Sequence, residues 1–253
     1  MSQPSYFDAM GYEEMISEYG RPESFVNEIA RMPRDKLQKL QNERFLKVVA
    51  FAWKIPFYQR HWGAANLIPD DIRSIADISK LPPYSKEDLM ASVEAYPPIG
   101  DFHGLDTYAD NDRPPLVFQT TSGTTGRPQP LLFGPKSREI QNLLLARFYA
   151  MQGIRRDDVL HSVYGHGMVN GGHYVREAVL HWTGAQLLTA GTGIETRSAN
   201  QVSLMKDFGA TAIIGFGDYI TYLASVARKE GLEPGRDLNI RVISGHMGAE
   251  GRE

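Results

Sequence analysis

The sequence predicts an α/β fold, with a mostly parallel sheet flanked by helices and preceded by an N-terminal helical region. Apolar strand-like runs alternate with helical stretches from about residue 135 onward, an order that favours parallel strands joined by crossover helices. The first hundred residues instead combine helical spacing of apolar residues with frequent prolines. A length of 253 residues, with 42% hydrophobic and 23% charged residues, is ordinary for a globular protein.

Two regions are predicted, a helical region over residues 1–110 and an α/β core over residues 111–253. In the first region, Asp35 is the expected N-cap of a long helix, because apolar residues recur after it at roughly helical spacing. That helix is expected to end near Ile55, because Pro56 disfavours helical geometry in the residue before it.

The core begins with a predicted strand, a polar loop and a second strand. Helices and strands then alternate, and one expected helix, over residues 135–152, places Leu143, Leu144, Arg147 and Phe148 on its buried face. The expected strands span residues 115–118, 130–133, 159–163, 185–189, 212–214 and 239–244, and the remaining helices span residues 172–182, 199–208 and 218–230.

Composition narrows the classes of function. The formal net charge of −3 gives no basic surface for nucleic acid. The absence of cysteine excludes disulfides, thiolate catalysis and cysteine-ligated metal centres. The N-terminus has neither the basic start nor the apolar core of a signal peptide, and no apolar run approaches the ~20 residues that cross a bilayer. A soluble cytoplasmic protein that binds neither membrane nor nucleic acid is therefore expected.

The polar loop over residues 119–128 is the strongest candidate site. It holds four threonines, a serine and two glycines, so its hydroxyls and turning backbone suit an anion such as phosphate. It is not a Walker A loop, because its glycines are three residues apart and a strand follows it. A threonine-rich hairpin turn that binds nothing is the alternative.

Four histidines lie within a short span. Their spacings fit no standard zinc pattern, and no cysteine assists them, so no metal site is assigned. These residues are His161, His166, His173 and His181.

These motifs carry a family resemblance. Residues 121–128 resemble the phosphate-binding signature of the adenylate-forming (AMP-binding) enzymes, and the chain as a whole resembles the phenylacetate–coenzyme A ligases within that superfamily. The resemblance covers nearly all of the chain after the first thirty-odd residues. It passes through residues 36–40, 55–58, 70–74, 81–82, 85–89, 164–167, 171–172, 207–209 and 248–250.

The resemblance implies a function and its cofactors. The implied activity is ATP-dependent activation of an aromatic or arylacetic-type acid as acyl-adenylate, followed by transfer to coenzyme A, with Mg²⁺ assisting. The implied partner is a small carboxylic acid, and a homodimer is an option. The nucleotide-binding residues that it implies are Thr121, Ser122, Gly123, Thr124, Thr125 and Gly126 around the triphosphate, and Gly248, Ala249 and Glu250 at the adenine.

The implied acid pocket departs from the family pattern. The relatives tend to carry Tyr and Phe where this chain has His166 and Val169, which favours a hydroxylated or heteroaromatic acid with His166 as its hydrogen-bond partner. A packed core histidine is the alternative for His166. Gln129 also stands where many members of the superfamily carry Lys. The implied pocket residues are Tyr164, His166, Met168, Val169, Gly171 and Gly172.

The resemblance also implies that the catalytic lysine lies beyond residue 253, so no catalytic residue is assigned. On this interpretation the chain is an N-terminal fragment, with an apparently truncated core, that is inactive alone. A naturally short form and one half of a split enzyme are the alternatives. Two other functions stay open: an adenylating enzyme with an acceptor other than coenzyme A, and a non-catalytic homologue that binds nucleotide or acid.

Overall fold

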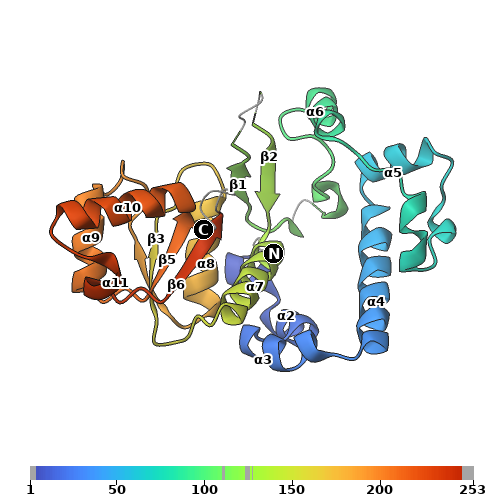
Figure 1. The fold of residues 1–253 in the computed structure, drawn as a ribbon. Helices are drawn as coiled ribbons and strands as arrows, with labels where there is room; N and C mark the ends of the chain where they lie inside the picture. Colours follow the sequence, from blue (N-terminus) through green and yellow to red (C-terminus); the bar gives the residue numbers. More distant parts are fainter. Residues whose placement is uncertain (1–3, 110–111, 123–125, 127, 247–253) are drawn as a thin grey trace.

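The computed structural model describes residues 4–109, 112–122, 126 and 128–246. Its centre is a four-stranded parallel sheet in the order β4-β3-β5-β6 (Figure 1). The predicted parallel sheet is therefore confirmed. Its strands are β3 (Val159–Ser162), β4 (Gln186–Thr189), β5 (Ala212–Phe216) and β6 (Val242–His246).

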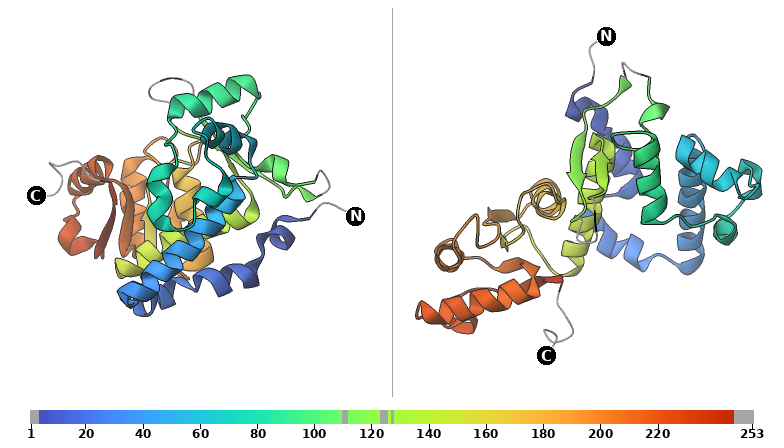
Figure 2. Two further views of the ribbon diagram at one scale, coloured as in Figure 1. Left: turned by 90° about the vertical axis from the view of Figure 1, so that its right-hand side faces the viewer. Right: turned by 90° about the horizontal axis from the view of Figure 1, so that it is seen from above.

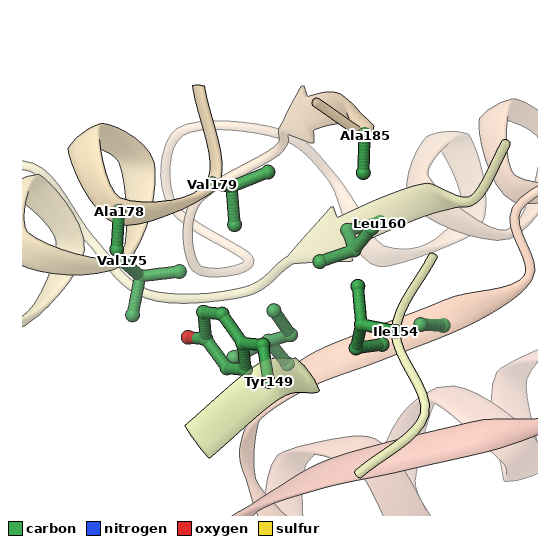
Figure 3. Close-up of a cluster of buried hydrophobic side chains, with 9 residues drawn as sticks. Tyr149, Ile154, Leu160, Val175, Ala178, Val179 and Ala185 are labelled. Atoms are coloured by element: carbon green, nitrogen blue, oxygen red, sulfur yellow. The ribbon is translucent and has the colours of Figure 1, made fainter. Parts of the chain in front are cut away.

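Helices cover both faces of this sheet. Strand β5 carries apolar side chains on both faces of the sheet, because consecutive side chains of a strand point to opposite faces. Ala212 and Ile214 join the cluster under α7 and α8, which Figure 3 shows around Tyr149 and Leu160, whereas Ile213 joins the cluster under α9 and α10. The helices of the core are α7 (Pro135–Met151), α8 (Gly171–Trp182), α9 (Ser198–Asp207), α10 (Gly217–Lys229) and the short α11 (Pro234–Asp237).

Helix α7 buries a different face from the one predicted. Leu143 and Arg147 are buried as expected, but Leu144 and Phe148 are 45% and 49% exposed. The buried stripe runs through Leu143, Ala146 and Arg147, and a helix turns about 100° per residue, so the positions after Leu143 and Arg147 point away from it. The sequence showed an apolar stripe without showing which neighbours would cover it.

The N-terminal helices form two groups. Helix α2 packs with α7 and α8 through a cluster around Met15 and Trp182, while α4 and α5 share a separate cluster around Val49 and Trp62. Figures 1 and 2 both show α4 beyond the β1–β2 hairpin, on the side away from the parallel sheet. The helices are α1 (Tyr6–Met10), α2 (Tyr12–Tyr19), α3 (Pro22–Asn27), α4 (Arg34–Ala52), α5 (Pro56–Gly63) and α6 (Lys86–Ala95), and the 3₁₀ turns are η1 (Ile29–Arg31), η2 (Pro69–Asp71), η3 (Ile75–Lys80) and η4 (Leu105–Thr107).

The start of α4 differs from the prediction. Its N-cap is Pro33, not Asp35, and Asp35 lies in the first turn. An acidic side chain is also favourable there, because it faces the positive end of the helix dipole. An acidic residue at the N-cap and an acidic residue in the first turn give similar sequence patterns, which explains why Asp35 was predicted as the N-cap.

The predicted strand, loop and strand form the antiparallel hairpin of β1 (Val117–Thr120) and β2 (Pro130–Phe133), with Thr120 opposite Pro130. Strand β1 lies two residues later than the predicted 115–118, because its pairing with β2 extends through Gln119 and Thr120 of the predicted loop. Within the described part of the chain these two strands form a sheet of their own, and an isolated bridge joins Thr120 to Val169. None of the described helices is both long and apolar enough to cross a lipid bilayer.

A buried carboxylate ties the first helix to the core. Glu139 of α7 is 2% exposed and accepts hydrogen bonds from the Tyr6 hydroxyl at 2.7 Å and the Trp182 indole at 2.9 Å, while Nδ1 of His181 lies 3.1 Å from it. Burial alone would raise the pKa of Glu139, but the hydrogen bonds from His181, Tyr6 and Trp182 outweigh it, and the pKa is lowered. The hydrogen bond to Glu139 in turn raises the pKa of His181, against the effect of burial.

These shifts predict a pH dependence of stability. A raised histidine pKa stabilises the fold fully below its unfolded value of about 6.5, and this contribution disappears as pH rises through the folded pKa. The lowered pKa of Glu139 stabilises the fold at pH values above the unfolded pKa of about 4.3. The wild-type protein should therefore lose stability relative to His181→Asn as pH rises above about 6.5, as measured by urea unfolding. Parallel pH profiles for the two proteins would refute this.

Candidate functional site

The candidate site lies where the hairpin meets the carboxyl edge of the parallel sheet. The backbone N–H of Thr120, at the end of β1, donates to the carbonyl of Met168 at 2.8 Å, in the loop that follows β3. Loops at the carboxyl ends of parallel strands are where α/β proteins bind ligands. The base of the hydroxyl-rich loop, after β1, therefore lies beside the glycine-rich loop of residues 164–170. This second loop is called here the acid loop because the sequence predicts an acid pocket there, and the two segments are well separated in the sequence.

The base of the hydroxyl-rich loop is closed by Thr121 and Gln129. The N–H of Thr121 donates to the carbonyl of Gln129, and the N–H of Gln129 donates to the Thr121 hydroxyl, both at 3.1 Å. Because that hydroxyl accepts this bond, its own proton can donate to an anion. Ser122 and Gly126 are exposed beyond this closure.

Gly126 has φ near +147°, a conformation that side chains rarely adopt, and open space surrounds it within the described structure. The predicted contacts Gly123, Thr124 and Thr125 lie outside the described residues.

The acid loop carries a half-buried aromatic ring and two exposed apolar side chains. The ring of Tyr164 is half-buried and meets Phe216 edge-on, with centroids 5.1 Å apart, and burial raises the pKa of its hydroxyl. Met168 and Val169 are 56% and 49% exposed. Side chains of this kind suit an apolar part of a small ligand, because covering them removes apolar surface from water.

His166 is not a satisfied core histidine. Its Nε2 is buried without a hydrogen-bond partner among the described residues, and its ring meets that of His173 edge-on at 5.5 Å. Burial lowers the pKa of His166, and the charges of His173 and Arg176 lower it further, against the opposing effect of Glu195. The ring is therefore neutral at pH 7, when one nitrogen can donate and the other accept.

The two glycines of the predicted acid pocket have different surroundings. A Cβ atom on Gly172 would lie 2.1 Å from the carbonyl oxygen of Gly165, so the first turn of α8 packs directly on the backbone of the acid loop. A Cβ atom on Gly171 would meet its nearest neighbour, Tyr164, at 3.9 Å. The structure therefore explains Gly172 by close packing of backbone on backbone.

Gln201 forms hydrogen bonds to several segments beside the sheet, and the sequence analysis did not identify it. Its side chain is fully buried, and its amide donates to the carbonyls of Gly191 at 3.2 Å and Thr196 at 2.8 Å, while its oxygen lies 3.0 Å from Nε2 of His161. A glutamine inside a helix carries no sequence signal for this role, because its partners come from other segments.

Glu195 was also missed, and it supports the acid loop from the segment after β4. Its carboxylate accepts the N–H of Thr192 at 2.9 Å and the Thr192 hydroxyl, and the backbone of His166 also helps to lower its pKa. The hydrogen bond from the Thr192 hydroxyl is the main reason that the pKa of Glu195 is lowered.

The four clustered histidines do not converge. His161 bonds Gln201 and His181 bonds Glu139, whereas His166 and His173 face each other. Within the described ranges, no three His, Asp or Glu side chains are grouped as metal ligands would be.

The adenine-contacting residues expected from the sequence, Gly248, Ala249 and Glu250, lie outside the described residues. The strand before them ends at His246, which is paired with Phe216 at the carboxyl edge of the sheet. The chain therefore leaves β6 at the edge where the acid loop begins.

A cavity lies away from the candidate site. A volume of about 650 Å³ opens at the base of the hairpin, between α4 and the start of α7, and its lining includes Arg44, Phe51, Leu132 and Ile140. None of the predicted site residues that the structure describes lines it. The candidate site is therefore supported by strand topology and loop contact, and not by an enclosed hollow.

The chain is similar in sequence to known coenzyme A ligases. No family model matches the chain. The phenylacetate–coenzyme A ligase of Thermus thermophilus is 29% identical over 211 residues, which are 82% of this chain and 44% of that protein. The phenylacetate–coenzyme A ligase of Escherichia coli is 31% identical over 180 residues, which are 69% of this chain and 37% of that protein. The chain is phenylacetate–coenzyme A ligase-like.

Solved structures agree with this assignment. An open conformation of 2-hydroxyisobutyryl-CoA ligase, in complex with 2-HIB-AMP and CoA, matches with a TM-score of 0.75 at 26% identity, covering 85% of this chain and 45% of that one. A second structure, in the thioesterification state, matches with the same TM-score of 0.75 at 28% identity. The phenylacetate–coenzyme A ligase-like chain thus spans less than half the length of each of these relatives.

Proposed function

We propose that this chain supplies the phosphate-binding and acid-binding parts of an AMP-forming acid–coenzyme A ligase. In the first step, an oxygen of the carboxylate attacks the α-phosphorus of ATP, and pyrophosphate leaves. In the second step, the thiol of coenzyme A attacks the acyl carbonyl carbon, forming a thioester and releasing AMP. Both reactants of the first step are anions, so positioning and charge stabilisation carry most of the catalysis.

The contact between Thr120 and Met168 is the observation that carries this proposal. It brings the hydroxyl-rich loop within one hydrogen bond of the acid loop, and adenylation requires a phosphate site and a carboxylate site side by side. The likeness to phenylacetate–coenzyme A ligases and to 2-hydroxyisobutyryl-CoA ligase supports the same reaction.

The described residues fit the nucleotide. Thr121 has a hydroxyl proton to donate, Ser122 is exposed, and open space surrounds Gly126 within the described structure. ATP supplies the activating phosphate, and Mg²⁺ is proposed as its companion, held by few protein groups because it is usually bound largely through phosphates and water. Coenzyme A is proposed as acceptor from the likeness to the ligases alone.

We propose an aromatic or arylacetic-type acid that carries a hydroxyl group. Tyr164, Met168 and Val169 provide the apolar surface for its carbon skeleton. Nε2 of His166, which has no hydrogen-bond partner among the described residues, provides a hydrogen bond for the hydroxyl of the acid, and a buried polar atom gains most from such a partner.

A panel of acids tests this proposal. Using protein expressed from the complete reading frame, acid-dependent exchange of labelled pyrophosphate into ATP is measured with phenylacetate, 4-hydroxyphenylacetate, mandelate and 2-hydroxyisobutyrate. We expect exchange with a hydroxylated acid. In His166→Phe, the ratio of kcat/KM for that acid to kcat/KM for phenylacetate should fall about tenfold, which corresponds to the loss of one hydrogen bond. His61→Phe, in the distant helix α5, is the control and should leave this ratio unchanged.

Two alternative functions give different results in the same assays. Exchange without thioester formation when coenzyme A is added would indicate an acceptor other than coenzyme A. Failure of all acids to support exchange would indicate a non-catalytic binder and would overturn the proposal. The chain of 253 residues alone is expected to form no thioester.

A further inference from the structure

A fully buried arginine stands between the two halves of the candidate site. Arg138, in the first turns of α7, is 0% exposed, and its guanidinium lies 5.3 Å from the ring centroid of Phe133 on β2. It donates from Nε to the carboxylate of Glu177 on α8 and from Nη1 to the side-chain oxygen of Asn170. One guanidinium thus touches the hairpin, the helix after the acid loop and the last residue of that loop.

Asn170 occupies the N-cap of α8 without capping it. Asparagine is among the best N-cap residues because its side-chain oxygen can accept a free N–H of the first turn. In the described structure that oxygen accepts from Arg138 instead, and the side chain makes no capping bond. The Asn170 side chain therefore bonds to α7 and does not form the N-cap hydrogen bond of α8.

Burying a guanidinium is costly unless it is paired and hydrogen-bonded. Glu177 supplies the opposite charge, and Asn142 also donates to Glu177 at 3.1 Å. The ion pair alone would join α7 to α8. The additional bond to Asn170 extends the ion pair to the acid loop, close to Met168, whose carbonyl accepts the N–H of Thr120.

We propose that Arg138, acting through Asn170, is a positioning residue that fixes the acid loop relative to the phosphate-binding hairpin. The proposal deepens the function proposed above and rests on it for the identity of the ligand. Arg138 itself is buried and touches no reacting atom. Its effect is to hold Met168 and Val169 at the distance from Thr120 and Thr121 that adenylation requires.

Paired variants separate this role from general stability. Asn170→Ala removes the link to the loop and keeps the Arg138–Glu177 ion pair, whereas Asn142→Ala removes a hydrogen bond to the same Glu177 carboxylate without touching the loop. Hydrogen exchange of the backbone amides of residues 165–169 is measured in both variants. We expect at least about tenfold faster exchange in Asn170→Ala, near wild-type exchange in Asn142→Ala, and recovery in Asn170→Asp, which restores an acceptor for Arg138.

Affinity provides the second measurement. Titration calorimetry of the protein from the complete reading frame should show at least about tenfold weaker binding of a hydroxyphenylacetyl-sulfamoyl-adenosine probe to Asn170→Ala, with ATP affinity unchanged. Unchanged loop exchange in Asn170→Ala, equal acceleration in Asn142→Ala, equal losses for probe and ATP, or global unfolding of Asn170→Ala would each overturn the proposal. Failure of the wild-type protein to bind the probe would count against the proposed function alone, because the exchange comparison would still decide the role of Arg138.

Discussion

Gly172→Ala is expected to destabilise the protein by about 3 kcal/mol, the upper end of what a forced overlap in a packed core costs. The added methyl carbon would lie 2.1 Å from the Gly165 oxygen and 2.9 Å from the Gly165 carbonyl carbon. Both are backbone atoms, so no side chain can rotate away to make room. Either α8 or the acid loop must move, and urea unfolding measures the loss.

The adjacent glycine is a matched control for this variant. Gly171→Ala adds the same methyl group in the same turn of α8, where its nearest neighbour would be an ordinary contact with Tyr164 at 3.9 Å. It should be neutral or stabilise the protein by about 0.5 kcal/mol, because replacing glycine by alanine reduces the conformational entropy of the unfolded chain. Equal effects of the two substitutions would contradict the packing of α8 on the acid loop.

Glu139→Ala should cost about 2–4 kcal/mol in free energy of unfolding, because it leaves several donors without their acceptor. Trp182 is 7% exposed and would bury an unpaired indole N–H, and the hydroxyl of Tyr6 would lose its bond to α7. The Tyr6 contact also attaches α1 to α7. Limited proteolysis should therefore cleave near α1 faster in the variant, and chemical unfolding gives the magnitude.

A surface carboxylate provides the comparison. Glu14 of α2 also pairs with α7, through Lys136 at 2.8 Å, but its side chain is 69% exposed. Solvent and salt screen such a pair, so Glu14→Ala should leave the melting temperature almost unchanged. A similar loss in both variants would show that burial does not set the value of the Glu139 contacts.

Local patterns were enough to predict most of the fold. A hairpin was expected around the hydroxyl-rich loop and is present, although β1 (Val117–Thr120) begins two residues later than predicted and includes the first two residues of that loop. The alternation after residue 135 became a parallel sheet with helices on both faces. Strand periodicity and proline placement are local properties, so they can be read from a sequence. The start of β6, which was expected at residue 239 and lies at Val242, depends instead on where pairing with β5 begins.

Contacts between distant segments could not be predicted in this way. The roles of Arg138, Asn170 and Gln201 depend on partners brought together by the fold, and each residue is ordinary in its own segment. Gly172 was assigned to the acid pocket from a motif, and only the structure shows that a methyl group there is excluded by Gly165. The burial of Arg147 was expected, but its neighbour Phe148 faces outward because no element covers that side of α7 within the described structure.

We propose that nucleotide phosphate binds the loop after β1, beside the acid loop. A crystal structure of the protein from the complete reading frame with ATP would show where the triphosphate lies. We expect phosphate oxygens within hydrogen-bonding distance of Thr121 or Ser122, on the side of the hairpin where Thr120 meets Met168. A triphosphate bound elsewhere, for example in the cavity lined by Arg44 and Phe51, would contradict it.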